Sequence, residues 1–219
     1  MTAVAVKVSL VMKKIVCLSD THNCNENITV PEGDVLIHSG DATIHGTVEE
    51  IVRFDRWFSA LPHKHKIFVA GNHDLLFETQ PERAQGLLSR NIIYLQDSSV
   101  SIEGINIYGS PWQPRFFDWA FNLNRGAEMA KKWKLIPAEV DILITHGPPF
   151  GILDQTPFGD NAGCEELLKK VTQVRPKAHI FGHIHNGYGA GEKFGVKFFN
   201  ACNCSEDYIP ANPPLVFEF

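Results

Sequence analysis

Acidic, amide and imidazole side chains stand at the ends of five short apolar runs in this sequence. The runs read IVCLSDTHN, VLIHSGD, IFVAGNHD, ILITHG and HIFGHIH. In α/β sheets, ligands collect beyond the carboxyl ends of the strands, so side chains that follow five strands can meet at one place. The residues that could bind metal there are Asp20, His22, Asp41, Asn72, His146, His183 and His185.

The mixture of ligand types narrows the choice of metal. Imidazole together with carboxylate suits Mn, Fe, Zn or Co better than Ca or Mg, and the lack of thiolate argues against a closed structural zinc site. Seven ligands are too many for one tetrahedral ion, but they suit two ions that share a carboxylate. Two ions about 3.5–4 Å apart form the clamp that hydrolytic enzymes use in phosphoryl transfer.

The elements that must position these residues are strands and helices in alternation. Compact β-branched runs bounded by Gly, Asp, Asn or Pro predict buried strands at 14–18, 34–38, 66–70, 140–145, 177–181 and 196–199. Apolar residues at helical spacing predict helices over 47–61, 124–136 and 163–174. Alternation around Gly104 predicts a hairpin within 98–112. The pattern indicates an α/β fold that has enough strands for two sheets and has its helices on the outside.

Composition and charge exclude several classes of protein. The chain has 219 residues, of which 44% are hydrophobic, and a net charge of −5. One sizeable core is therefore expected, and the lack of a basic run argues against extended nucleic-acid or anionic-membrane binding. No apolar run reaches the roughly 18 residues of a membrane span. Five cysteines without a C-x-x-C pair fit a reducing cytoplasm better than a disulfide framework.

The N-terminal stretch is mildly apolar but is interrupted by Lys7, Lys13 and Lys14. Since no small-residue cleavage site follows it, a signal peptide is not expected. We predict an N-terminal extension over residues 1–12 and a single domain over residues 13–219.

Taken together and in this order, the five motifs resemble the signature of the calcineurin-like metallophosphoesterases. Each motif is weak alone, whereas five in this order are specific. The H-x-H spacing of the last motif, for example, also occurs in HKH at 63–65. Further segments, such as GDVLIHSGD, IYGSPWQP, FNLNRG and FGHIHNGYG, are similar to the metallophosphoesterase-domain-containing (MPPED) proteins, and this similarity runs from Lys13 to Phe219. Asp74 departs from that subfamily, which often has Glu at this position. The five motifs are Asp20-Thr21-His22, Gly40-Asp41, Gly71-Asn72-His73-Asp74, His146-Gly147 and Gly182-His183-Ile184-His185.

The resemblance implies a two-sheet αββα sandwich of the metallophosphoesterase type and a role for each motif residue. His73 would protonate the leaving oxygen or steady the charge on the phosphoryl group, and Asp74 would hold the other ring nitrogen of His73. The implied cofactors are two divalent transition-metal ions, with Mn favoured and Fe or Zn as alternatives. One ion would take Asp20, His22, Asp41 and His185, and the other would take Asp41, Asn72, His146 and His183, with Asp41 bridging.

The resemblance also implies hydrolysis of a small phosphoester by a hydroxide that bridges the two ions. Similarity to the subfamily favours phosphodiesters, such as cyclic nucleotides. Two alternatives stay open: a hydrolase for phosphomonoesters, phosphoproteins or pyrophosphates, and a non-catalytic scaffold that binds partners. Among the motif loops, only Arg115 could hold the extra charge of a monoester, which mildly favours diesters. The oligomeric state is left open.

Other polar residues have a simpler structural interpretation. His38 and His179 are expected in the core, whereas His45, His63 and His65 are expected in solvent. The loop Trp112-Gln113-Pro114-Arg115 could stack on a substrate ring, although packing is at least as good an interpretation. Cys202-x-Cys204 could form a redox or metal pair, but two small, semi-buried thiols are the favoured interpretation.

Overall fold

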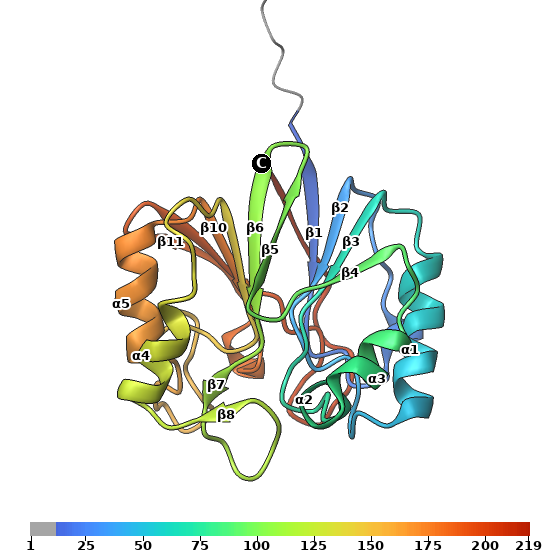
Figure 1. The fold of residues 1–219 in the computed structure, drawn as a ribbon, viewed down its shortest axis with the longest axis horizontal. Helices are drawn as coiled ribbons and strands as arrows, with labels where there is room; N and C mark the ends of the chain where they lie inside the picture. Colours follow the sequence, from blue (N-terminus) through green and yellow to red (C-terminus); the bar gives the residue numbers. More distant parts are fainter. Residues whose placement is uncertain (1–11) are drawn as a thin grey trace, which may run out of the picture.

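The computed structural model describes residues 12–219, and most of its strands belong to two large sheets (Figure 1). The predicted N-terminal extension lies outside the described residues, except for Met12. The first sheet has five strands in the order β13-β1-β2-β3-β4, and the second has six in the order β11-β12-β10-β9-β6-β5. A two-stranded sheet pairs β7 (Gln113–Pro114) with β8 (Asn122–Leu123).

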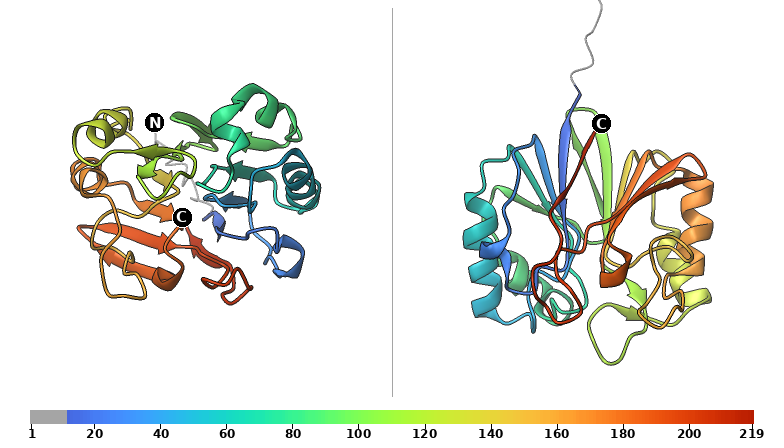
Figure 2. Two further views of the ribbon diagram at one scale, coloured as in Figure 1. Left: turned by 90° about the horizontal axis from the view of Figure 1, so that it is seen from below. Right: turned by 180° about the vertical axis from the view of Figure 1, so that it is seen from behind.

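In the first sheet, four strands are parallel and the last strand of the chain is antiparallel at one edge. Figure 2 shows this C-terminal strand beside β1, at the seam between the sheets. The strands are β1 (Lys14–Leu18), β2 (Val35–His38), β3 (His65–Phe68), β4 (Ile92–Tyr94) and β13 (Leu215–Glu218).

The second sheet also has a parallel centre, with an antiparallel strand at each edge. The edge strands are β5 (Ser98–Ile102) and β11 (Gly189–Lys193), and the central ones are β6 (Ile105–Ser110), β9 (Ile142–Thr145), β10 (Ala178–Phe181) and β12 (Val196–Asn200).

Helices cover the outer face of each sheet (Figure 1). On the first sheet, α1 begins with a capping box, in which Thr47 and Glu50 each bind the backbone of the other. The helices on this sheet are α1 (Val48–Ala60), α2 (Leu76–Thr79) and α3 (Pro81–Gly86), and those on the second are α4 (Ala127–Trp133) and α5 (Glu165–Val174). Single turns of 3₁₀ helix occur at Asn25–Asn27 and His185–Gly187. Among residues 12–219, no helix is both long and apolar enough to cross a membrane.

Three apolar clusters hold four layers together. Successive residues of a strand point to opposite faces, so Ile15 and Cys17 face the other sheet while Val16 and Leu18 face the helices. The outer clusters bury Phe54 and Phe58 of α1 against the first sheet and equivalent residues of α4 and α5 against the second. Strands buried on both faces need continuous apolar runs, which is why the runs in the sequence do not alternate. The predicted αββα sandwich is confirmed.

The predicted elements agree with the structure apart from their ends and several short elements. The strand predicted over 66–70 lies at His65–Phe68. The Val69 amide makes a last bond to the His38 carbonyl at 3.0 Å, and the chain then continues to Gly71 at the site. The three predicted helices and the 98–112 hairpin are confirmed. The elements that were not predicted include α2, α3, β4 and the glycine-containing edge strand β11.

Candidate metal centre

The predicted ligands meet where the two sheets abut, beyond the carboxyl ends of five parallel strands. Asp20 and His22 follow β1, Asp41 follows β2, and Asn72 follows β3 in the first sheet. His146 follows β9 and the pair His183 and His185 follows β10 in the second sheet. Five of the seven side chains are almost completely buried, and His183 and His185 are half-buried. The structure therefore brings all seven together.

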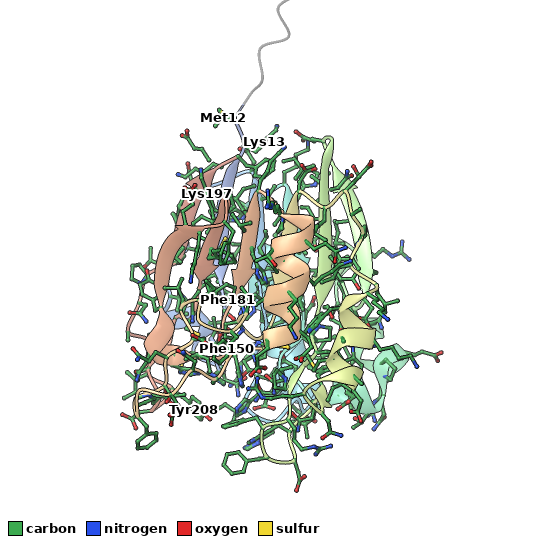
Figure 3. All side chains as sticks on the ribbon, turned by 90° about the vertical axis from the view of Figure 1, so that its left-hand side faces the viewer. Met12, Lys13, Phe150, Phe181, Lys197 and Tyr208 are labelled. Carbon is green, nitrogen blue, oxygen red and sulfur yellow. The ribbon has the colours of Figure 1, made fainter. Side chains whose placement is uncertain are left out.

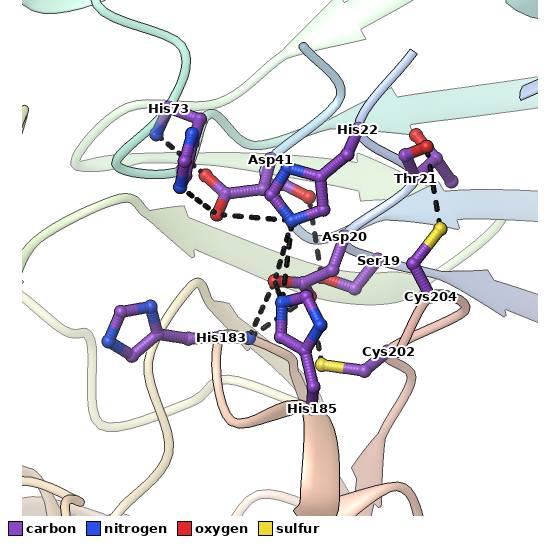
Figure 4. Close-up of polar contacts among 12 residues, drawn as sticks. Ser19, Asp20, Thr21, His22, Asp41, His73, His183, His185, Cys202 and Cys204 are labelled. Carbon is purple, nitrogen blue, oxygen red and sulfur yellow. Dashed lines mark hydrogen bonds and ion pairs between the residues drawn. The ribbon is translucent and has the colours of Figure 1, made fainter. Parts of the chain in front are cut away.

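One half of this cluster contains Asp20, His22 and His185 (Figure 4). The Nε2 atom of His185 lies 3.5 Å from Asp20 Oδ1 and 3.4 Å from Nε2 of His22. The backbone amide of His183 donates to both Asp20 oxygens, at 3.1 and 3.0 Å, so the β10 loop fixes the carboxylate of the β1 loop. Three ligand atoms from two sheets thus face one point.

The other half contains Asp41, His146 and His183, with Asn72 beside them. The Nε2 atom of His146 lies 3.4 Å from Asp41 Oδ2 and 2.9 Å from Asn72 Oδ1. The same Asp41 oxygen is 3.8 Å from Nε2 of His22. Asp41 is therefore the carboxylate that borders both halves.

Backbone carbonyls orient two of the imidazole rings. The Nδ1–H of His146 donates to the Ser39 carbonyl at 3.0 Å, and that of His185 donates to the Ser205 carbonyl at 2.8 Å. A ring held through Nδ1–H presents Nε2 to the cluster, which is the arrangement that metal-binding histidines use.

Burial and charge set the protonation of the cluster. Burial lowers the pKa of His22 to about 4 and that of His183 to about 3, so both rings are neutral at pH 7. Burial acts in the same direction on His146 and His185, but the neighbouring carboxylates outweigh it and raise the pKa of each ring to about 9. In return, these rings hold the carboxyl pKa of Asp20 and Asp41 well below the ordinary value, in spite of burial.

The backbone of the cluster is unusual at several ligands. Asp20, His22, Asp41 and His183 all have positive φ, at 53°, 40°, 54° and 68°. Asp and His adopt this left-handed conformation more readily than most residues, but it remains sparsely populated outside glycine and concentrates at functional sites. Gly71 is required for a different reason, since a Cβ there would lie 2.6 Å from Cε1 of His146 and would overlap Asp41.

The donor set fits divalent transition-metal ions. Four imidazoles, two carboxylates and an amide oxygen converge in a buried space, a combination that suits Mn, Fe or Zn. Without metal, the two anionic carboxylates are balanced by protons on His146 and His185. A divalent ion can replace these protons, because each ring that loses its proton has a neutral Nε2 atom that can bind the ion.

His73 lies next to the ligands, with its ring at the edge of the cleft. Its Nε2 is 4.0 Å from Asp41 Oδ2 and 3.5 Å from the Tyr208 hydroxyl. Its Nδ1–H donates to the Ile44 carbonyl at 2.7 Å. The implied contact of His73 with Asp74 is therefore wrong, because this carbonyl takes the position that Asp74 was expected to hold.

Asp74 has another function in the structure. Its buried carboxylate accepts from the backbone amides of Gly71 at 2.8 Å and Thr43 at 3.0 Å, and from the Thr43 hydroxyl at 2.7 Å. Burial and the charge of Asp41 raise its carboxyl pKa to about 6. Asp74 thus fixes the β2 loop to the β3 loop and acts on His73 only through the backbone.

A cavity of about 330 Å³ opens beside the cluster. Phe116, Phe158 and Tyr208 form its apolar walls, and all three lie outside the five motifs. None of the described residues that line it is Lys or Arg. A larger cavity of about 580 Å³, lined by Met12 and Lys13, contains none of the predicted site residues. Figure 3 shows Met12 and Tyr208 at opposite ends of the molecule.

The remaining histidines agree with the predictions in three cases out of five. His38 and His179 are buried in the core, and His45 is exposed. His63 is not solvated as predicted: its ring is buried and bonds the Pro31 carbonyl at 3.0 Å. His65 is half-buried beside Glu103, a partner that is distant in sequence.

Aromatic residues close to the cluster were only partly predicted. Trp112 packs on Phe121 and donates to Asp97 at 2.9 Å, so it serves the interior and not a substrate. Trp119, further along the same loop, packs on His73 with the ring centres 4.1 Å apart. Tyr208 packs on His22 at 4.2 Å and was not predicted, because no motif surrounds it. The CNC segment that precedes Tyr208 does not indicate that this residue lies at the site.

Comparisons with known proteins agree with this geometry. The sequence profile of the calcineurin-like phosphoesterase family matches residues 13–187. The chain is 45% identical to metallophosphoesterase domain-containing protein 1 of Homo sapiens and of Mus musculus, over 94% of this chain and 70% of each relative. It is 43% identical to a UPF0046 protein of Caenorhabditis elegans, over 93% of this chain and 74% of that protein. The crystal structure of TT1561 from Thermus thermophilus has the same fold, with a TM-score of 0.58, 12% identity and coverage of 86% and 88%.

Proposed function

Because this chain belongs to the calcineurin-like phosphoesterase family and is a metal-dependent phosphoesterase, we propose that its substrates are phosphodiesters. The supporting observation is the charge of the cavity. A phosphomonoester carries one more negative charge than a diester, and sites for dianionic phosphate normally supply Arg or Lys to balance it. No such cation lines the cavity among residues 12–219. Arg115, the one motif-loop candidate, instead pairs with Asp118 at 3.8 Å and is 55% exposed.

We propose a division of the ligands that follows the two halves of the cluster. Asp20, His22, Asp41 and His185 would hold one ion, and Asp41, Asn72, His146 and His183 would hold the other. When bound, the ions supply Lewis-acid activation of the phosphoryl group and of a water nucleophile. Mn is the favoured metal, with Fe and Zn as alternatives.

His73 is proposed as the catalytic acid. Its Nδ1–H is committed to the Ile44 carbonyl, so only Nε2 can exchange a proton with a substrate. Nε2 lies near Asp41 and Tyr208, which line the cavity with His73, and from there a protonated ring can donate to the leaving oxygen or to the phosphoryl oxygens. Trp119 packs on one face of the ring and limits its rotation.

Cyclic nucleotides are proposed substrates within the diester class. Phe116, Phe158 and Tyr208 offer aromatic faces on which a base can stack. The five free cysteines support a reducing cytoplasm as the location. We also propose that residues 13–219 form a single domain.

The test is a hydrolysis screen with the purified protein loaded with Mn²⁺, Fe²⁺ or Zn²⁺. Bis-p-nitrophenyl phosphate and cyclic nucleotides should be hydrolysed with a kcat/KM at least about tenfold above that for p-nitrophenyl phosphate, or about 1.4 kcal/mol in activation free energy. A preference for monoesters or pyrophosphates would contradict the diester proposal. A protein that binds metal but hydrolyses none of these compounds would support a partner-binding scaffold.

A further inference from the structure

The thiol of Cys202 lies against the carboxylate of Asp20. Its Sγ is 3.0 Å from Asp20 Oδ2, and both side chains are completely buried (Figure 4). The backbone holds this contact in place, because Ser19 and Cys202 form a parallel bridge between the β1 and β12 ends. The Cys202 amide also donates to Asn200 Oδ1 at 3.2 Å.

The two oxygens of Asp20 have different surroundings. Oδ1 faces the proposed ligands, at 3.5 Å from Nε2 of His185 and 4.0 Å from Nε2 of His22. Oδ2 faces away from them, toward Cys202 and the backbone of Gly182, where a Cβ would overlap it. The His183 amide reaches both oxygens and so does not distinguish them. Among the described residues, the Cys202 side chain is therefore the group that distinguishes the two oxygens, because it bonds Oδ2 and not Oδ1.

We propose that Cys202 is a positioning residue that holds Asp20 Oδ1 toward the metal by donating its S–H to Oδ2. The thiol is the donor, because a carboxylate oxygen can only accept. A carboxylate held in this way loses less rotational freedom when it binds an ion, and partners of metal ligands commonly affect affinity for this reason. The inference rests on the proposed metal site but not on the proposed substrate.

The chain contains a matched control two residues away. Cys204 is also buried, but its Sγ is 3.6 Å from the Thr21 carbonyl and bonds no proposed ligand. Removing either thiol leaves a small cavity, so Cys202→Ala and Cys204→Ala should destabilise the protein similarly. Only Cys202→Ala also removes a donor from Asp20.

The test measures Mn²⁺ binding to the metal-free protein by calorimetry, together with its thermal unfolding without metal. Cys202→Ala should weaken Mn²⁺ binding roughly tenfold, the lower end of the usual effect for partners of metal ligands. Cys202→Ser, which keeps a donor, should restore most of the affinity, and Cys204→Ala should bind as the wild type does.

Two results would overturn the inference. Cys202→Ala and Cys204→Ala could bind Mn²⁺ equally well, or Cys202→Ser could bind as weakly as Cys202→Ala, which would assign the effect to packing. If the wild-type protein bound no Mn²⁺, the proposed metal function itself would fail. If Mn²⁺ bound as expected but no diester were hydrolysed, only the substrate proposal would fail.

Discussion

Asp41 is the side chain on which both halves of the cluster depend, since its Oδ2 lies 3.8 Å from His22 Nε2 and 3.4 Å from His146 Nε2. Asp41→Asn should lower kcat/KM by roughly 100-fold or more, because a neutral amide stabilises the positive charge of the two proposed ions less than a carboxylate does. Metal content measured by mass spectrometry should fall at both sites, whereas Asp20→Asn should affect one. Glu192→Gln, at an exposed residue of the other cavity, serves as the control. Two tightly bound ions in Asp41→Asn would contradict the bridging role.

His73 should matter most when the leaving group is poor. A good leaving group such as p-nitrophenolate departs without a proton, whereas an alkoxide needs one. His73→Ala should therefore lower kcat by roughly 10²–10⁴-fold on a cyclic nucleotide and by much less on bis-p-nitrophenyl phosphate. Metal content should not change, because His73 is not among the proposed ligands. An equal loss on both substrates would assign His73 to charge stabilisation instead of proton transfer.

His179 gives a pH dependence of stability that is independent of the metal centre. The Thr145 hydroxyl donates to the Gly147 carbonyl at 2.7 Å, so the Nε2–H of His179 donates to that hydroxyl at 2.8 Å. Burial lowers the pKa of His179 to about 3 from the ordinary value of 6.5. The unfolded chain therefore binds a proton below pH 6.5 that the folded protein does not. The neutral ring therefore makes its full contribution to the free energy of unfolding above pH 6.5. This contribution decreases as the pH falls from 6.5 toward 3.

His179→Gln should remove this contribution. Between about pH 7 and pH 5 the wild-type protein should lose about 2 kcal/mol more of its free energy of unfolding than the variant does. Urea denaturation at several pH values, with a chelator present throughout, measures the difference. The exposed His45→Gln should follow the wild type. Parallel curves for wild type and His179→Gln would contradict the neutral buried ring.

Residue types and order predict the ligands because metal chemistry restricts which side chains can serve. Contacts with the backbone have no such restriction. Any residue at position 44 offers a carbonyl to His73, so the sequence could not show that Ile44 replaces Asp74 in this contact. The sequence predicts only a small, semi-buried thiol at Cys202, because the Asp20 carboxylate beside it is 182 residues away in the chain.

At the scale of elements, long apolar runs identify the central strands and amphipathic spacing identifies α1, α4 and α5. The segments that were missed are short. The helix α2 has four residues and α3 has six, too few for a periodic pattern. The strand β11 contains two glycines and is mostly exposed, so it forms through pairing with β12 and not through its own propensity.

The start of α1 links an element to His73, the proposed catalytic acid. Glu50 accepts from the Thr47 amide at 2.9 Å in the capping box, and also from the amides of Ile44 at 3.3 Å and His45 at 3.1 Å. Since the Ile44 carbonyl holds the His73 ring, Glu50 fixes the loop that orients this proposed catalytic acid. Thr47 contributes only to the cap.

Thr47→Ala should therefore cost about 1 kcal/mol of stability and leave kcat unchanged. Glu50→Ala should cost about 1–3 kcal/mol, because it also leaves loop amides without a partner, and should lower kcat on a poor leaving group. Chemical denaturation and steady-state kinetics separate the two effects. A similar fall in kcat for both variants would mean that helix stability, and not the loop, controls His73.

At the scale of the whole molecule, the site lies where the two sheets abut, so each sheet supplies some of the proposed ligands. The sequence could predict that five strand ends carry ligands, but not which loops would wall the cavity. Phe116 and Phe158 come from segments between elements, and their placement depends on contacts that have no local signature. The walls that contact a substrate are therefore the part of the molecule that the sequence motifs determine least.

The walls of the cavity are aromatic and acidic. Glu206 lines it beside Tyr208, and the loops that carry Phe116 and Phe158 also carry the exposed Asp118 and Asp160. The protein has a net charge of −5. A cationic group on the substrate can therefore lie on an aromatic face next to a carboxylate, where attraction to the ring contributes about 0.5–1 kcal/mol at an exposed site.

A diester with a cationic second ester group should consequently bind better than its neutral isostere. The KM of p-nitrophenyl phosphorylcholine should be roughly 2–5-fold lower than that of 3,3-dimethylbutyl p-nitrophenyl phosphate at low ionic strength, and salt should reduce the difference. Glu206→Gln and Phe158→Leu should each weaken the preference, whereas Glu192→Gln at the other cavity should leave it unchanged. Equal KM values for the two esters in the wild type, or a preference that survives both substitutions, would show that the charge of these walls does not select the substrate.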